Sequence, residues 1–106
     1  MASRAGSATS GSAAASKRAG IQFAYHNHGF EFAEQNGRIP YDVVLKDTDP
    51  ALVKLQLDLY WLSHDSKHPP RYWFDRAPGR FVMWHVKDMH KVSRDYTELG
   101  NGSIDY

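Results

Sequence analysis

Three short apolar runs each carry, at or near their carboxyl ends, a side chain that can bind a metal ion. The runs and their polar residues are 21–25 with His26, 55–61 with Asp58, and 81–84 with His85. From His26 to Asp58 is 32 positions and from Asp58 to His85 is 27, close to the roughly 31 residues that one strand and helix unit takes in an eight-stranded α/β fold. The spacing predicts consecutive parallel strands, over 21–25, 55–61 and 81–86, that deliver the three side chains to one rim.

Helix signals separate the predicted strands. Pro40 suits the first turn of a helix, and apolar residues recur on one face after it, so the sequence predicts a helix over 40–48. A Pro-Pro pair at 69–70 opens a further helix. Upstream, 13–20 has the composition of the last turns of a helix that Gly20 ends.

Strands that alternate with helices of this length favour a parallel α/β architecture. Right-handed crossovers place the strand ends on one side of the sheet, where ligands bind in such folds. After the first strand, residues 26–29 open a loop, and Asn36-Gly37 predicts a tight turn before the helix at 40–48. Loops of this kind build sites at the carboxyl ends of strands.

Composition and charge narrow the function classes. The chain has 106 residues, 42% hydrophobic residues and a formal net charge of +1, which indicates one small globular unit with no electrostatic attraction to nucleic acid or to an anionic membrane. It has no cysteine, so any metal ligands are nitrogen and oxygen atoms, and no apolar run approaches the roughly 20 residues of a membrane span. We expect a cytoplasmic protein without a secretory signal.

The amino-terminal residues form a separate segment by composition. Residues 1–12 are rich in Ser, Ala and Gly, which predicts a disordered low-complexity leader, while 13–106 form the domain. The first acidic residue is Glu31, so an organelle transit peptide is one alternative for the leader, and mistranslated upstream sequence is another.

The side chains on the predicted rim form a competent set of metal ligands. Neutral imidazole nitrogen and carboxylate oxygen suit a divalent ion such as Zn, Mn, Fe, Co, Ni or Mg, so His26, Asp58 and His85 are the candidate ligands. Each residue alone has an ordinary structural alternative, because a buried His is commonly a hydrogen-bonded core residue and an Asp at a strand end is commonly a cap. The shared spacing favours the metal site.

Four further residues near the strand ends are candidates for substrate chemistry. His28 would contact substrate or hold a loop hydrogen bond, and Glu31 would be an acid or base or the solvent side of an extended segment. Lys87 would bind a substrate oxygen or form a surface ion pair with Asp88 beside it. Trp61 would stack on a sugar ring or fill the core.

Four ordered motifs resemble the sugar phosphate isomerase/epimerase family of xylose-isomerase-like TIM barrels. They are Ala24-Tyr25-His26-Asn27-His28 with Phe30-Glu31-Phe32, Leu57-Asp58-Leu59-Tyr60-Trp61, Trp84-His85-Val86-Lys87-Asp88-Met89, and Glu98-Leu99-Gly100-Asn101-Gly102-Ser103-Ile104-Asp105-Tyr106. The likeness covers about 13–106 and implies a partial (β/α)₈ barrel that moves protons on a metal-bound sugar or polyol through an enediolate-type intermediate.

The resemblance assigns metal ligation to His26, Asp58 and His85, with two departures from the family pattern. The family's first ligand is often a Glu that also acts as acid or base, whereas this chain has His26, which leaves room for a lyase, dehydratase or hydrolase. The chain corresponds to roughly the fifth to seventh barrel units, so a later Glu ligand has no counterpart in it. We therefore expect an incomplete fragment that is unstable alone or self-associates through open sheet edges.

Two alternatives to the isomerase remain open. A non-catalytic barrel remnant or interaction module would dimerise without taking up metal. A relative of the apurinic-site endonucleases would share the barrel and its metal, but the near-neutral charge disfavours a DNA-binding groove.

Overall fold

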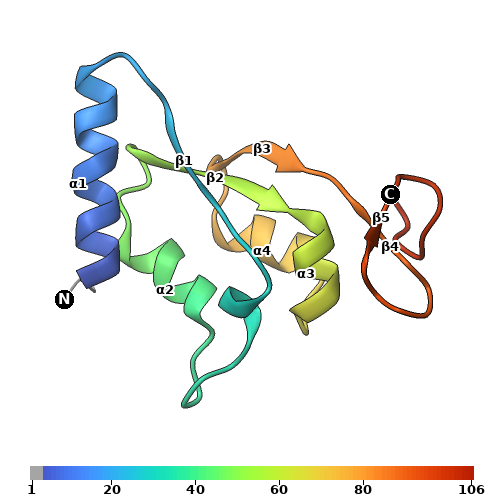
Figure 1. The fold of residues 1–106 in the computed structure, drawn as a ribbon. Helices are drawn as coiled ribbons and strands as arrows, with labels where there is room; N and C mark the ends of the chain where they lie inside the picture. Colours follow the sequence, from blue (N-terminus) through green and yellow to red (C-terminus); the bar gives the residue numbers. More distant parts are fainter. Residues whose placement is uncertain (1–3) are drawn as a thin grey trace.

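The structure is a computed structural model that describes residues 4–106. Along the chain the elements are α1 (Arg4–Arg18), β1 (Phe23–His26), the 3₁₀ turn η1 (Phe30–Phe32), α2 (Pro40–Asp47), β2 (Val53–Asp58), α3 (Leu59–Asp65), α4 (Pro70–Arg76), β3 (Phe81–His85), β4 (Asp88–Met89) and β5 (Tyr96–Thr97). Figure 1 shows α2, α3 and α4 on the same side of the sheet formed by β1, β2 and β3. The predicted α/β class is confirmed.

The central sheet is parallel and has the order β1-β2-β3. Its strands lie within two residues of the starts predicted from the apolar runs. Between β2 and β3 the register shifts by one residue, because Leu55 lies opposite Phe81 whereas the next residue, Gln56, lies opposite Met83. Val82 is therefore an extra residue on β3, and the shift determines which β3 side chains share a face with those of β2.

The core lies between the sheet and the helices. Strand β2 contributes Val53, Leu55 and Leu57, all fully buried, as expected for a central strand covered by crossover helices. The buried residues of the core cluster are Phe32, Tyr41, Leu57, Leu62 and Trp73. In it, the rings of Phe32, Tyr41 and Trp73 lie with centroids 4.8 to 5.4 Å apart, so η1, α2 and α4 pack on one another as well as on β2.

The amino-terminal segment differs from the prediction of a disordered leader over 1–12. Residues 1–3 lie outside the described part of the chain, and 4–12 belong to α1. Alanine has the highest helix propensity of all residues, and α1 packs through the buried Ala13. The predicted glycine stop is confirmed, because Gly20 has φ +75° and the amides of Gly20 and Ile21 donate to the last carbonyls of the helix.

The second predicted strand ends earlier than expected. The apolar run 55–61 predicts an extended segment throughout, but β2 ends at Asp58 and α3 begins at Leu59. The Asp58 side chain accepts a hydrogen bond from the Trp61 amide and so caps α3. A continuous apolar run cannot by itself distinguish a buried strand from the helix that follows it.

Arg80 connects the amino-terminal ends of β2 and β3 to the helix layer. Its buried guanidinium donates to the carbonyls of Leu45 and Val53 and to the Thr48 hydroxyl. Burial lowers the pKa of Arg80, and an Arg nevertheless stays charged in proteins. These bonds fix the carboxyl end of α2 against the start of β2.

Beyond β3, residues 88–106 form a small lobe around the antiparallel pair β4 and β5, at the right of Figure 1. Within residues 4–106, no further strand pairs with the outer edge of β3. Val82, Met83 and Trp84 on this strand are exposed, and so is Val86 just after it. None of the described helices is long and apolar enough to cross a membrane.

Candidate metal centre

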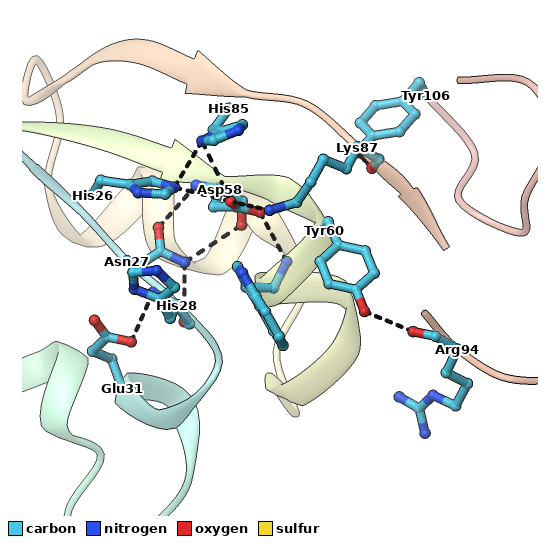
Figure 2. Close-up of polar contacts among 11 residues, drawn as sticks. His26, Asn27, His28, Glu31, Asp58, Tyr60, His85, Lys87, Arg94 and Tyr106 are labelled. Atoms are coloured by element: carbon cyan, nitrogen blue, oxygen red, sulfur yellow. Dashed lines mark hydrogen bonds and ion pairs between the residues drawn. The ribbon is translucent and has the colours of Figure 1, made fainter. Parts of the chain in front are cut away.

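The three predicted metal ligands meet at the carboxyl ends of three adjacent strands. His26 Nε2 lies 2.9 Å from Asp58 Oδ2 and 2.9 Å from His85 Nδ1, and His85 Nδ1 lies 3.6 Å from Asp58 Oδ2. Figure 2 shows the three side chains converging from β1, β2 and β3. The ligand atoms of the group all lie within 4.8 Å of one another.

Strand geometry explains the convergence. Asp58 lies opposite His85 in the β2–β3 ladder, and His26 lies opposite Gln56, two residues before Asp58. Residues at i and i+2 of a strand share a face, so all three side chains point to the side of the sheet away from the core helices. The sequence prediction that these residues share one rim agrees with this placement.

The spacing of the three donor atoms fits a first-row divalent ion. Metal bonds of about 2.0 to 2.2 Å to nitrogen and oxygen place neighbouring donors roughly 3 to 3.6 Å apart, which matches the distances among His26, Asp58 and His85. The two imidazole rings are stacked, with centroids 4.6 Å apart. Three protein ligands of this kind would leave further positions open for water or substrate.

Asp58 is the central residue of the site, because it is a candidate metal ligand and also caps α3. Its fully buried carboxylate accepts from the Trp61 amide through Oδ1, and from His26 and the Lys87 ammonium through Oδ2. Burial raises the pKa of Asp58, but the hydrogen bonds from Trp61, Lys87 and His26 outweigh it and hold the pKa below its usual value. The carboxylate is therefore ionised at neutral pH and ready to bind a cation.

Lys87 lies in the site, as predicted, but with a different partner from the surface pair considered for it. Its Nζ is 3.0 Å from Asp58 Oδ2 and lies 5.2 to 5.6 Å from the ring centroids of Tyr60, Trp61 and Tyr96. An ammonium group over aromatic faces gains cation–π attraction in addition to its ion pair. Lys87 thus joins the rim of the sheet to α3 and to the lobe at 88–106.

His28 and Trp61 form an aromatic flank of the site. The His28 ring lies 5.1 Å from that of His26 and 6.2 Å from that of Trp61, and it stacks on the exposed Phe30 at 5.9 Å. Figure 2 places His28 next to the candidate ligands. Two of the three residues predicted to bind substrate are therefore brought together here, and the third, Lys87, lies over the Trp61 ring.

Glu31, predicted as an acid or base, is not on an extended segment. It lies in η1, is buried, and accepts from the Tyr25 hydroxyl at 2.8 Å and from the His28 amide at 2.9 Å. Burial, together with the nearby Glu31 carboxylate, raises the pKa of Tyr25. Both carboxylate oxygens thus have local donors, and these bonds hold the loop that presents His28.

Asn27 is a residue of the site that the sequence analysis did not single out. It is fully buried, and its side chain accepts from the Asp58 amide at 2.8 Å and donates to the Asp58 carbonyl at 3.4 Å. Asn27 therefore joins the end of β1 to the end of β2 immediately beside the ligands. The sequence signal for Asn27 was its position next to the candidate ligand His26.

Comparison with solved structures agrees with the motifs. A structure described as a sugar phosphate isomerase/epimerase from Parabacteroides distasonis ATCC 8503 superposes with a TM-score of 0.72, at 28% identity over 86% of this chain and 36% of that one. A second structure with the same description and source gives a TM-score of 0.61, at 34% identity over 74% of this chain and 30% of that one. No protein-family model and no curated protein matches the sequence.

The chain thus spans about a third of the length of the structures it matches. Its parallel three-stranded sheet and helices correspond to part of a TIM barrel, as the resemblance implied. The rim that carries His26, Asp58 and His85 is the carboxyl end of that sheet, which is where TIM barrels build their active sites.

Proposed function

We propose that this chain, a partial barrel of the sugar phosphate isomerase/epimerase family, binds a divalent metal ion through His26, Asp58 and His85. Its substrate would be a sugar or polyol, and its activity would require the remaining barrel units. The observation that carries the proposal is the convergence of three donor atoms within 4.8 Å at the ends of three adjacent parallel strands. Structural polar residues have no reason to recur in this way on successive strands.

The residues around the ligands suit a polyhydroxylated substrate. When bound, a divalent ion would polarise a carbonyl or hydroxyl oxygen of the substrate and lower its proton affinity. The Lys87 ammonium lies beside the same carboxylate and has three N–H donors, one of which is engaged with Asp58. Trp61 and His28 offer ring faces on which the apolar side of a sugar would stack.

The proton-transfer groups are a separate matter from metal binding. Glu31 is buried and its two oxygens accept from Tyr25 and from the His28 amide, so we assign it to holding the His28 loop. We expect the acid and base to come from other units of the complete barrel, since TIM-barrel sites draw residues from the ends of several strands.

Metal titration of the purified chain tests the proposal. Calorimetry with Mn²⁺, Co²⁺ and Zn²⁺ should give one site, which Asp58→Asn and His85→Gln each weaken by at least about tenfold, as loss of one ligand predicts. His85 has a half-exposed side chain, so its variant should stay folded even where the buried Asp58 variant does not. Circular dichroism checks folding in each case.

Two variants with matched chemistry serve as controls. His90→Ala removes an exposed imidazole on the lobe, and Asp75→Asn removes an exposed carboxylate on α4. Both should bind metal as the parent chain does. Metal binding that survives both Asp58→Asn and His85→Gln would exclude the proposed ligand set.

The exposed apolar residues of β3 favour a second candidate, an interaction module without catalysis. Val82, Met83 and Trp84 lie exposed on a strand with an unpaired edge within the described residues 4–106, and the exposed Val86 follows that strand. Such edges promote pairing with another chain. Sedimentation velocity distinguishes this candidate: concentration-dependent dimers that Val82→Lys abolishes, in a chain that takes up no metal, would support it over the isomerase.

A further inference from the structure

Asp88 is a buried carboxylate that the proposed metal site does not use. Its Oδ1 accepts from the amides of Met89 and Ile104, and its Oδ2 accepts from the amides of Gly100 and Gly102, at 2.8 to 3.1 Å. It is 1% exposed, and no cationic side chain of residues 9–106 forms an ion pair with it. Four backbone donors therefore take the place of a counter-ion.

These four bonds organise the whole lobe at 88–106. A Cβ atom on Gly102 would lie 2.3 Å from Asp88 Oδ1 and 2.4 Å from the Met89 carbonyl oxygen, so the chain approaches the carboxylate closely only because position 102 is a glycine. Ser103 donates from its amide to the same Met89 carbonyl. The lobe has little apolar core of its own, since Val92, Tyr96 and Leu99 are all exposed.

The lobe in turn surrounds Lys87. It presents the Tyr96 ring to the Lys87 ammonium, and the Tyr106 hydroxyl donates to the Lys87 carbonyl at 2.6 Å, as Figure 2 shows. The lobe is fastened to α3, because the Tyr60 hydroxyl donates to the Arg94 carbonyl at 2.7 Å and the Arg94 guanidinium donates to the His64 carbonyl. The lobe that folds around Asp88 thus contacts both the side-chain ammonium and the backbone carbonyl of Lys87.

We propose that Asp88 is a positioning residue, whose carboxylate folds residues 88–106 into a lobe that holds the Lys87 ammonium against Asp58. It acts through Lys87 and touches none of the candidate metal ligands. The inference rests on the proposed function only for the role of Lys87 in binding a substrate. The position of its ammonium group is measurable without metal or sugar.

Acylation of lysine amines by an N-hydroxysuccinimide ester tests the proposal on the full chain without added metal. Mass spectrometry gives the rate at Lys87 relative to that at the exposed Lys67. We expect Asp88→Asn and Gly102→Ala each to raise this ratio by at least about threefold, the lower limit expected when an ion pair is lost. Thr97→Val removes a hydroxyl that donates to Glu98 on the same lobe, so it should leave the ratio unchanged.

Hydrogen exchange of the Gly100, Gly102 and Ile104 amides separates positioning from lobe structure. Faster exchange of these amides together with faster Lys87 acylation supports the proposal. Faster amide exchange with unchanged acylation would show that Asp58 and α3 hold Lys87 without help from the lobe. Unchanged amide exchange in both variants would show that the Asp88 carboxylate does not maintain the lobe structure. Exchange that also rises throughout β2 in both variants would overturn it as well, since Asp88 would then support the entire fold. Loss of metal binding in separate experiments affects none of these outcomes.

Discussion

The ion pair between Asp58 and Lys87 should stabilise the fold measurably, and a double-mutant cycle can isolate its contribution. The Asp58 side chain is fully buried and that of Lys87 is 22% exposed, with 3.0 Å between Nζ and Oδ2. Exposed pairs are worth up to about 1 kcal/mol, whereas breaking a buried pair costs about 3 to 5 kcal/mol. We expect Asp58→Asn to lower the free energy of unfolding by about 2 to 4 kcal/mol, between those limits.

The reason lies in the oxygen that the substitution replaces. In Asp58→Asn the side chain would keep an amide oxygen for the Trp61 amide, but its NH₂ group would face the His26 ring and the Lys87 ammonium, which donate to Oδ2 in the parent chain. Lys87→Met removes the cation while keeping most of the aliphatic length. The coupling energy between the two substitutions should be about 1 to 2 kcal/mol, as for a hydrogen bond to a charged group.

Urea unfolding at pH 7, followed by circular dichroism, measures all four members of the cycle. The exposed pair Arg71 and Asp75 on α4, at 3.8 Å, provides a matched control cycle, for which we expect no more than about 0.5 kcal/mol. A coupling energy for Asp58 and Lys87 no larger than that of the control pair would refute the reasoning, since burial would then add nothing to the interaction.

Three further predictions concern the core and the pH dependence. Leu57→Ala, at a fully buried position in the core cluster, should destabilise the chain by about 2 to 5 kcal/mol in urea unfolding, and a cost under about 1 kcal/mol would mean that the helix layer is loosely packed. Arg80→Met should cost about 3 kcal/mol because the carbonyls of Leu45 and Val53 lose a charged donor; thermal denaturation without a lower Tm would contradict this. Because the folded-state pKa of Asp58 is lowered, its contribution to stability is complete above the unfolded-state value of about 3.9 and is lost as the pH falls through the folded-state pKa. The stability difference between the parent chain and Asp58→Asn should therefore shrink on acidification in this range, and a constant difference would exclude this origin.

Local sequence signals located the three strands of the parallel sheet and the starts of α2 and α4. Apolar runs located β1, β2 and β3, and the prolines at 40 and 70 begin α2 and α4. The turn predicted at Asn36-Gly37 is present, with positive φ at both residues. These features depend on backbone preferences of single residues and on short-range periodicity, which a sequence displays directly.

The features that the sequence did not reveal depend on side-chain contacts between one element and the next. The burial of Glu31 follows from its bond to Tyr25 on the neighbouring strand, which no pattern within 30–32 displays. Helix α3 was missed because Asp58 ends a strand and caps a helix at once, and the apolar run continues through it. An Asp three residues before a potential N3 amide donor was the available signal.

The extra residue on β3 determines which side chain reaches the rim. If the pairing of Leu55 with Phe81 continued without the shift at Val82, Asp58 would lie opposite Trp84 in place of His85, because each step along one parallel strand matches one step along the other. An indole would then stand where the imidazole does, and His85 would face the helix layer. A one-residue insertion between Val82 and Trp84, with the pairing of Leu55 and Phe81 kept, would likewise place Trp84 opposite Asp58 and remove His85 from the proposed metal-binding rim, whereas deletion of Val82 would remove only the irregularity. Insertions in this part of β3 are therefore more dangerous to the proposed site than loss of its extra residue.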